Sequence, residues 1–288
     1  MRNTKRKSKL SKAFSLIELS IVILIIGILV AGVTQSSRLL NQMRLISARS
    51  QTLASPVPTI PNLISWYESV SDKSFDENQM SDQALLSNWY DINPTSTDKK
   101  NASQANDINK PQYSIDQGTG LPVVKFVDQD FFNLPNGTIP FANMPYTIIF
   151  VSRTNSFCVC GVMGSGSYNN NNQTNAFRYD PAAGVFYNYW FNVDLGISNA
   201  SVINKLQIYT FTYNLSLREG FVDGVFKGST PSSNRASTSI NNTIGTTFTL
   251  EYMNGTIAEI IIFDRALKTE ERKAIESYLG KKWRIPIQ

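Results

Sequence analysis

The sequence predicts a mainly β protein carried on one long N-terminal α-helix. A largely apolar run, Phe14–Val33, is followed by helical spacing up to Ala54, where a proline cluster ends the helix. From about Ile60 onward, short β-branched and aromatic runs alternate with clusters of Asn, Gly, Ser and Pro, as is typical of strands joined by turns. Many such strands in one region favour a two-sheet sandwich or jelly roll over a parallel sheet.

The basic excess of the chain lies in its first 13 residues. Residues 1–13 contain six Lys or Arg side chains and no acid, and removing these six from 27 leaves 21 basic side chains against 22 acidic ones. Because the remainder has no cationic excess for phosphates, we expect no nucleic-acid partner. The chain also lacks His, which excludes His-based acid–base catalysis and most zinc sites.

The apolar run 14–33 has the length of a membrane span. Its 20 residues include only three polar ones, among them Glu18, and a helix of this length rises roughly 30 Å, enough for the hydrocarbon core. The basic residues before it predict a cytoplasmic N-terminus, with the rest of the chain outside the cytoplasm. An ordinary signal peptide cut near Ala31–Val33, giving a mature N-terminus near Thr34, is the alternative.

Glu18 distinguishes this segment from a plain membrane anchor, because a carboxylate in a membrane helix is costly and usually functional. The surrounding string K-A-F-S-L-I-E-L resembles the processing site of type IV prepilins and type II secretion pseudopilins. The resemblance implies that residues 1–13 are a leader, that prepilin peptidase cuts between Ala13 and Phe14, and that the Phe14 amine is methylated. The family usually has Gly where Ala13 stands.

Phe14 and Glu18 are the expected assembly residues. When apolar helices bundle, a buried carboxylate needs a cation, which the Phe14 amine of a neighbouring subunit can supply. Such a pair would set the register between subunits. The resemblance therefore implies three partners: other pilin subunits, the peptidase and the bacterial inner membrane. It also implies an inner-membrane precursor with a periplasmic head that later reaches a pilus or the cell surface.

Beyond the apolar run, the helix is predicted to extend over 14–54, and residues 55–61 are a proline-rich linker. Residues 62–288 form the predicted sandwich, closed by a helix over 270–282 with acidic residues at its start and lysines at its end. Asp223-Gly224 predicts a hairpin. The expected strands are Leu63–Tyr67, Leu86–Asp91, Pro122–Phe126, Tyr146–Arg153, Val185–Phe191, Leu206–Tyr213, Gly220–Val222, Val225–Gly228 and Gly255–Phe263.

The C-terminal string GTIAEIIIFDRALKTEERKAIESYLGKKW, Gly255–Trp283, resembles the end of bacterial laminin G-like, concanavalin A-like lectin domains. Four earlier pieces fit the same pattern in order, at Leu63–Glu68, Asn88–Asn93, Leu121–Phe126 and Phe221–Val225. The resemblance implies a jelly-roll sandwich of two antiparallel sheets, in a family whose members often bind glycans or proteins and sometimes calcium. It departs from the usual pilin head, in which a helix packs on a small antiparallel sheet.

Candidate ligand-binding residues lie in the polar loop Ser167–Asn175. Tyr168 is placed to stack on a sugar face, and Asn170 and Asn172 offer amide donors and acceptors, whereas the alternative is a solvated loop. Trp190, within YNYWF, is a candidate exposed aromatic, with a core position as the alternative.

Asp128 and Asp130 at a strand end are candidate calcium ligands, with plain turn acids as the alternative. We expect no other cofactor.

Cys158 and Cys160 form a C-x-C pair. In a strand they would point to one face about 7 Å apart, which favours two small buried side chains over a disulfide formed in an oxidising compartment.

No enzyme activity is expected. The E-x-D-x-E and E-x-D-x-x-E strand motifs of related hydrolases are missing from the sequence, as is any nucleophile–base pair built on His.

The sequence therefore predicts a type IV pilin-like filament subunit, minor rather than major, whose lectin-like head mediates adhesion or contacts a glycan or surface protein. One alternative is a type II secretion pseudopilin with a purely structural role. The other is a secreted or anchored lectin-like binding protein.

Overall fold

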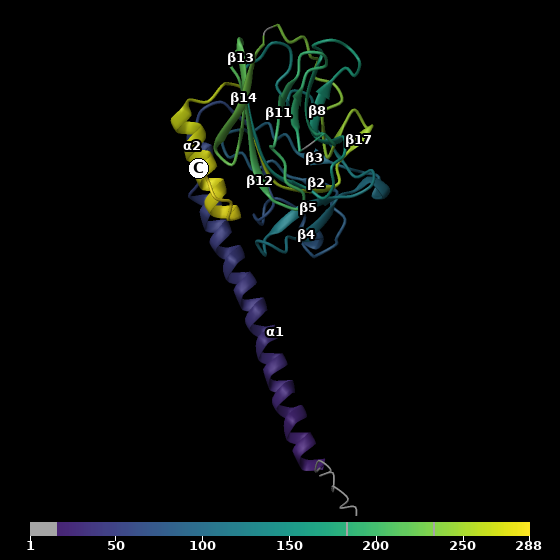
Figure 1. Cartoon of the computed structure of the whole chain (residues 1–288), viewed down its shortest axis with the longest axis vertical. Coiled ribbons are helices and arrows are strands. Elements are labelled where there is room, and N and C mark those ends of the chain that lie inside the picture. The colour runs from purple at the N-terminus through teal and green to yellow at the C-terminus, as the bar shows by residue number, and fades with distance from the viewer. Residues whose placement is uncertain (1–15, 183, 233) are drawn as a thin grey trace, which may run out of the picture. The chain divides into compact units, whose positions relative to one another are not determined.

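The computed structural model describes residues 16–182, 184–232 and 234–288, except for the side chains of residues 33–35, 37 and 38. The chain divides into two compact units, Met1–Arg44 and Leu45–Gln288. Helix α1, Leu16–Leu53, contributes residues to both units (Figure 1). The predicted cleavage site, Ala13 and Phe14, lies outside the described residues.

Helix α1 contains 38 residues with Glu18 in its first turn. Its hydroxyl groups bond to the helix's own carbonyls, since Ser20 Oγ donates to the Ile17 oxygen and Ser36 Oγ to the Gly32 oxygen, each at 2.8 Å. Within the part of the chain that the structure describes, no helix is both long enough and apolar enough to cross a membrane. The predicted span at 14–33 is therefore not confirmed.

The segment after α1 is packed rather than extended. Its prolines end the helix, and Val57–Thr59 form a single 3-10 turn, η1. Val57 is fully buried and Ile60 nearly so. The predicted linker 55–61 thus supplies side chains to the core of the second unit.

Two antiparallel sheets make up the bulk of the second unit (Figure 1). The first sheet has the order β14-β13-β12-β7-β18-β5-β4, with β1 also paired to β18. Its strands are β14 (Val225–Pro231), β13 (Leu217–Val222), β12 (Gln207–Tyr213), β7 (Tyr146–Thr154), β18 (Gly255–Phe263), β5 (Pro122–Phe126), β4 (Gln112–Ile115) and β1 (Leu63–Glu68).

The second sheet has the order β11-β10-β9-β8-β15-β6-β3-β2, and a separate hairpin joins β16 (Thr246–Thr247) to β17 (Glu251–Tyr252). Its strands are β11 (Leu195–Ile197), β10 (Phe186–Tyr189), β9 (Thr174–Tyr179), β8 (Cys160–Gly166), β15 (Thr243–Ile244), β6 (Phe132–Asn133), β3 (Ala102–Ser103) and β2 (Asn88–Trp89). The predicted two-sheet sandwich is confirmed.

Strands β8 and β9 were not expected from the sequence, and for β8 the reason is its glycine content. The run CGVMGSG of β8 has the composition of a turn. In the structure these glycines let the β16–β17 hairpin approach the strand, because a Cβ at Gly161 would lie 2.3 Å from the Thr247 backbone nitrogen. Gly164 also faces Thr247, whose methyl group would be 3.0 Å from an added Cβ.

Two large cores stabilise the sandwich. The first lies between the sheets and is dominated by aromatic side chains, including Phe150, Phe177 and Phe211. The second lies on the other face of the first sheet, where Ala48 of α1, Val57 and helix α2 (Thr269–Trp283) cover the strands. Figure 1 shows α2 running along this sheet. Glu271 fixes the start of α2 by accepting a hydrogen bond from the Lys268 backbone nitrogen at 2.8 Å.

A buried ionic cluster lies within this second core. Lys282 Nζ is 2.9 Å from both Glu68 Oε2 and Glu259 Oε2 and 3.0 Å from the Tyr278 hydroxyl. The Glu259 carboxylate also accepts hydrogen bonds from Tyr278 and from the indole nitrogens of Trp66 and Trp283. Burial lowers the pKa of Lys282, but the attraction of Glu259 and Glu68 outweighs it, so the net direction is upward. The cluster ties β1, β18 and α2 together.

Candidate ligand-binding face

The outer face of the second sheet carries a group of aromatic side chains. In β9, Phe177 and Tyr179 point into the inter-sheet core, so Arg178 points outward. In β10, Phe186 packs in that core, whereas Tyr187 and Tyr189 belong to a separate cluster with Phe191 and Phe248. The alternation of strand side chains thus places aromatic rings on the face away from the core.

One row of residues crosses three neighbouring strands on this face. Tyr187 of β10 is in register with Gly196 of β11 on one side and with Arg178 of β9 on the other. A Cβ at Gly196 would lie 2.5 Å from Tyr187 Cε1, so the absence of a side chain leaves room for the tyrosine ring over β11. Gly196 itself is exposed. The ring therefore lies along the sheet surface, as a stacking platform for a flat ligand must.

Arg178 orients the neighbouring rings. Its guanidinium carbon lies 4.1 Å from the Tyr189 ring centroid and 6.0 Å from that of Tyr187. The same guanidinium pairs with Glu251 of the hairpin, which also accepts a hydrogen bond from the Thr247 hydroxyl. Burial raises the pKa of Tyr189 to about 12, so its hydroxyl stays protonated well into the alkaline range.

Tyr168 joins this cluster from the polar loop. Its side chain is 40% exposed, and its ring centroid lies 5.0 Å from Phe248 and 6.4 Å from Phe191. Phe191 in turn lies 5.9 Å from Tyr189. We refer to Tyr168, Tyr187, Tyr189, Phe191 and Phe248, together with Arg178, as the aromatic face.

The two predicted asparagines have different roles beside Tyr168. Asn170 is exposed, and its side-chain nitrogen donates to the backbone carbonyl oxygen of Tyr168 at 3.1 Å. Asn172 joins three loops: its backbone nitrogen donates to Phe191, its oxygen accepts from Ala236, and its side-chain nitrogen donates to the Asn234 oxygen at 2.6 Å. Asn170 is thus exposed at the edge of the aromatic face, whereas Asn172 shapes the loop.

Trp190 is not an exposed aromatic residue, and that expectation is corrected. It is fully buried, and its indole nitrogen donates to Asn175 Oδ1 at 3.3 Å. The guanidinium carbons of Arg218 and Arg235 lie 3.7 and 5.2 Å from its ring centroid. Because β10 alternates, Trp190 points inward while its neighbours Tyr189 and Phe191 point outward.

The two candidate calcium ligands differ in environment. Asp128 is exposed in a turn with a φ of 49°. Asp130 is 4% exposed, and its Oδ2 accepts a hydrogen bond from the Val127 backbone nitrogen at 2.9 Å. Burial raises the pKa of Asp130 to about 6. Among the described residues, no group of three or more His, Cys, Asp or Glu side chains is arranged to hold a metal. The calcium site remains a prediction.

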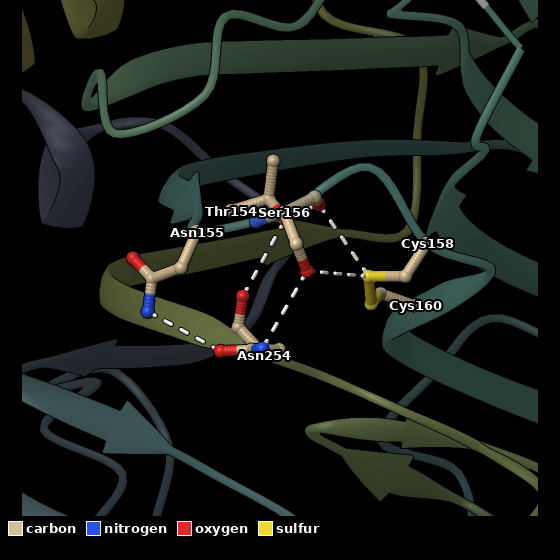
Figure 2. Close-up of a disulfide and its surroundings, with 6 residues drawn as sticks. All are labelled: Thr154, Asn155, Ser156, Cys158, Cys160 and Asn254. Carbon is tan, nitrogen blue, oxygen red and sulfur yellow. Dashed lines mark hydrogen bonds between the residues drawn. A yellow bond between two sulfur atoms is a disulfide. The ribbon is translucent and has the colours of Figure 1, made fainter.

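Cys158 and Cys160 are joined in a disulfide, so the favoured expectation of two separate thiols is corrected (Figure 2). Cys158 precedes β8 rather than lying in it, and the chain bends there to bring the two Cα atoms to 5.2 Å. Figure 2 shows Ser156 beside the bridge, with its Oγ 3.6 Å from Cys158 Sγ and 3.5 Å from Asn254 Nδ2. The bridge thus fastens the turn between β7 and β8.

Comparison with known proteins identifies the N-terminal segment, which contains Glu18 in the first turn of α1. Residues 8–34 match the prokaryotic N-terminal methylation motif. The prepilin resemblance of the sequence is therefore confirmed for this segment. No curated protein gives a significant match to the chain.

Among solved structures, the chain is similar to domain 4 of AbnA, a GH43 extracellular arabinanase from Geobacillus stearothermophilus in complex with arabinotriose (14% identity, TM-score 0.51, 75% of this chain and 98% of that chain). It is also similar to an arabinofuranosidase complexed with arabinofuranosyl-alpha-1,2-xylobiose (9% identity, TM-score 0.56, 69% and 51%). A third is Trypanosoma rangeli sialidase (14% identity, TM-score 0.52, 80% and 34%). The chain spans about half of the arabinofuranosidase and about a third of the sialidase. At these identities the likeness establishes the sandwich fold alone.

Proposed function

We propose that this protein is a type IV pilin-like filament subunit with a glycan-binding head. The observation that supports the first part is the match of residues 8–34 to the methylation motif, a range that overlaps the start of α1. In this proposal the inner-membrane precursor is cut between Ala13 and Phe14, and Phe14 is methylated. The subunit then joins a filament on the cell surface.

Glu18 has the role of assembly partner in this proposal. Within a bundle of apolar helices, its carboxylate would pair with the Phe14 amine of the adjacent subunit and fix the axial register. The apolar residues of α1 around it, including Ile17 and Leu19, are 69% and 55% exposed in the single chain. Burying such side chains between subunits would drive assembly through the hydrophobic effect.

The filament proposal is tested by mass spectrometry of the mature N-terminus from sheared filaments. An N-methylated Phe14 is the expected result, whereas an intact Met1 or a start near Thr34 would refute it. Glu18→Gln should be processed normally but assemble poorly, while Ser20→Ala, a nearby change without charge, should assemble normally. If the Glu18→Gln variant assembled fully, Glu18 would not be needed to set the register between subunits.

The aromatic face is the proposed glycan site of the head. Aromatic rings offer flat apolar surfaces to the C–H faces of sugars, and the Tyr hydroxyls and the Asn170 amide offer hydrogen bonds to sugar hydroxyls. Glu251, the carboxylate beside these rings, is engaged by Arg178 and Thr247. It is therefore held in an ion pair rather than poised to protonate a leaving group, which favours binding over hydrolysis.

The head proposal is tested by glycan-array binding of the full chain in mild detergent. Tyr168→Ala and Tyr187→Ala should each lower binding by about tenfold, the effect of removing a central aromatic contact. Phe226→Ala is the matched control, since Phe226 is an aromatic of the first sheet and is 52% exposed. Unchanged binding by the Tyr168/Tyr187 double variant would refute the site. No binding to any glycan, with normal assembly, would favour a purely structural subunit of the pseudopilin kind.

A further inference from the structure

A separate pocket of about 250 Å³ lies at the end of the first sheet, away from the residues of the aromatic face. Four segments line it: the turn after β4, the end of β7, the loop before β12 and the chain after α2. Three cationic side chains, Arg153, Lys205 and Arg284, line the pocket together with a single carboxylate, Asp116. The lining thus has an excess of positive charge.

The carboxylate of Asp116 is already bonded to groups of the protein itself. It is 3% exposed, its Oδ1 lies 2.6 Å from Arg153 Nη1, and its Oδ2 accepts hydrogen bonds from the backbone nitrogen and the hydroxyl of Thr119 at 2.8 and 2.9 Å. These bonds hold the Arg153 guanidinium in a fixed orientation. Asp116 therefore positions Arg153 and has little further capacity to attract a cation.

Arg153 is incompletely satisfied by the protein. Its Nε is buried and has no hydrogen-bond partner among the described residues, although an unpaired buried donor is destabilising. About a fifth of the side chain, 20%, is exposed at the pocket. A planar guanidinium that is oriented by one carboxylate and partly exposed at a pocket is suited to a second planar anion.

The other two cations are also available to a ligand. Lys205 is 50% exposed, and its contact with Asp223 is long at 3.4 Å, so this pair contributes little. Arg284 is exposed and forms no ion pair with any residue that the structure describes. Its backbone takes a left-handed turn with a φ of 57° directly after α2. That turn brings Ile285 and Pro286, which follow it, to the pocket wall.

The remaining lining indicates a sugar rather than a bare ion. Leu206, Ile285 and Pro286 supply apolar surface, while Thr119 and Asn204 supply polar groups of the kind that bind hydroxyls. A volume of about 250 Å³ is slightly below the range of pockets for drug-sized ligands, and so suits one small ring. We propose that this pocket binds a carboxylate-bearing sugar residue of an acidic glycan, with the carboxylate on Arg153 and flanked by Lys205 and Arg284.

The test is calorimetric titration of the full chain in mild detergent with trigalacturonic acid and with the neutral galactotriose. Trigalacturonic acid should bind and galactotriose should not compete with it. Lys205→Ala and Arg284→Ala, both at exposed positions, should each weaken binding by about threefold and together by about tenfold. Arg153→Lys keeps the charge but loses the planar fork, and should weaken binding at least as much as either alanine variant.

Two controls separate this pocket from other charges and from the aromatic face. Lys227→Ala removes an exposed cation of β14 and should have no effect. Failure of the aromatic face is measured with neutral glycans on Tyr168→Ala, and failure of this pocket with trigalacturonic acid on the Lys205/Arg284 double variant, so the two failures are distinguishable. An unchanged affinity in the Lys205/Arg284 double variant would overturn the proposal. Equal competition by inorganic phosphate or by a hexaglutamate peptide would overturn the sugar assignment.

Discussion

Replacing Lys282 with Met tests whether the buried ionic cluster holds the head together. The substitution keeps an unbranched side chain of similar volume but removes the ammonium, so the cavity contribution to the change is small. Lys282 and Glu68 are both fully buried and Glu259 is 1% exposed. Two carboxylates would then lie in an apolar core without the cation that lies 2.9 Å from each.

The expected loss in the free energy of unfolding is about 3–4 kcal/mol. Removing one partner of a buried ion pair typically costs about 3–5 kcal/mol, because the other charge stays buried without its partner. Both carboxylates keep other donors: Glu68 accepts from the Val70 and Ser71 backbone nitrogens, and Glu259 accepts from Trp66, Tyr278 and Trp283. These bonds place the loss towards the lower end of that range.

The assay is urea unfolding of the full chain in mild detergent, followed by tryptophan fluorescence. Trp66 and Trp283 both bond to Glu259, so their emission reports on the cluster itself. The raised pKa of Lys282 means that its contribution is complete below the unfolded lysine value and is lost only as pH rises through the higher folded value. The contribution of Lys282 to the stability of the wild-type protein should therefore be the same at pH 6 and pH 8.

Lys281→Met is the matched control, because Lys281 is exposed on the same helix and its replacement should change stability by less than about 0.5 kcal/mol. Adding Glu259→Gln to Lys282→Met should recover part of the loss, since it removes one of the two buried charges. A loss below about 1 kcal/mol for Lys282→Met would refute the reasoning.

Three further changes give distinct outcomes. Trp190→Ala should destabilise the head by about 3–5 kcal/mol in the same assay, because it empties a fully buried site between Arg218 and Arg235; a loss near zero would contradict the packing. Asp130→Asn should raise the free energy of unfolding at pH 7 by about 1–2 kcal/mol and leave it unchanged near pH 4. The reason is that a pKa of about 6 in the folded state penalises the ionised carboxyl, and this penalty is absent below the unfolded pKa and complete above pH 6. An equal effect at both pH values would contradict this. Reducing the Cys158–Cys160 disulfide should lower the free energy of unfolding by no more than about 2 kcal/mol, because the disulfide closes a very short loop. A larger downward shift in the urea midpoint would show that the disulfide stabilises more of the head than the turn between β7 and β8.

The strands that could be predicted are those with a strong local pattern. β5 and β18 begin and end where the sequence places them, at Pro122–Phe126 and Gly255–Phe263. Asp223 and Gly224 both have positive φ and form the hairpin between β13 and β14. β-branched runs and an Asp-Gly turn depend on neighbours in the chain, so they are visible in the sequence alone.

The aromatic face could not be assigned from the sequence because β10 is aromatic on both sides. In the run FYNYWF, Phe186 and Trp190 point inward while Tyr187 and Tyr189 point outward. The sequence pattern itself does not show whether the even-numbered or the odd-numbered residues are buried. Only the pairing of β10 with β9 and β11 decides it. Tyr168 could be proposed because its polar surroundings marked a surface loop.

The buried ionic cluster and the pocket lined by Arg153, Lys205 and Arg284 could not be predicted from the sequence for a different reason. Lys282 and Glu68 are separated by 214 residues, and the pocket combines four distant segments. No local pattern records such contacts, and a charged residue in an amphipathic helix is most simply taken as exposed.

The outer face of the first sheet is covered and that of the second sheet is partly exposed, which affects which positions of the sequence can change. The first sheet is covered on its outer face by Ala48, Val57 and α2, so changes there disturb the core. On the second sheet, Gly196 and Tyr168 are exposed, and their neighbours Tyr187 and Phe191 are only partly buried. A substitution at the exposed Tyr168 carries little folding penalty, whereas a side chain at Gly196 would have to displace the Tyr187 ring. Sequence change is therefore accepted more readily on this face of the second sheet than on the covered face of the first.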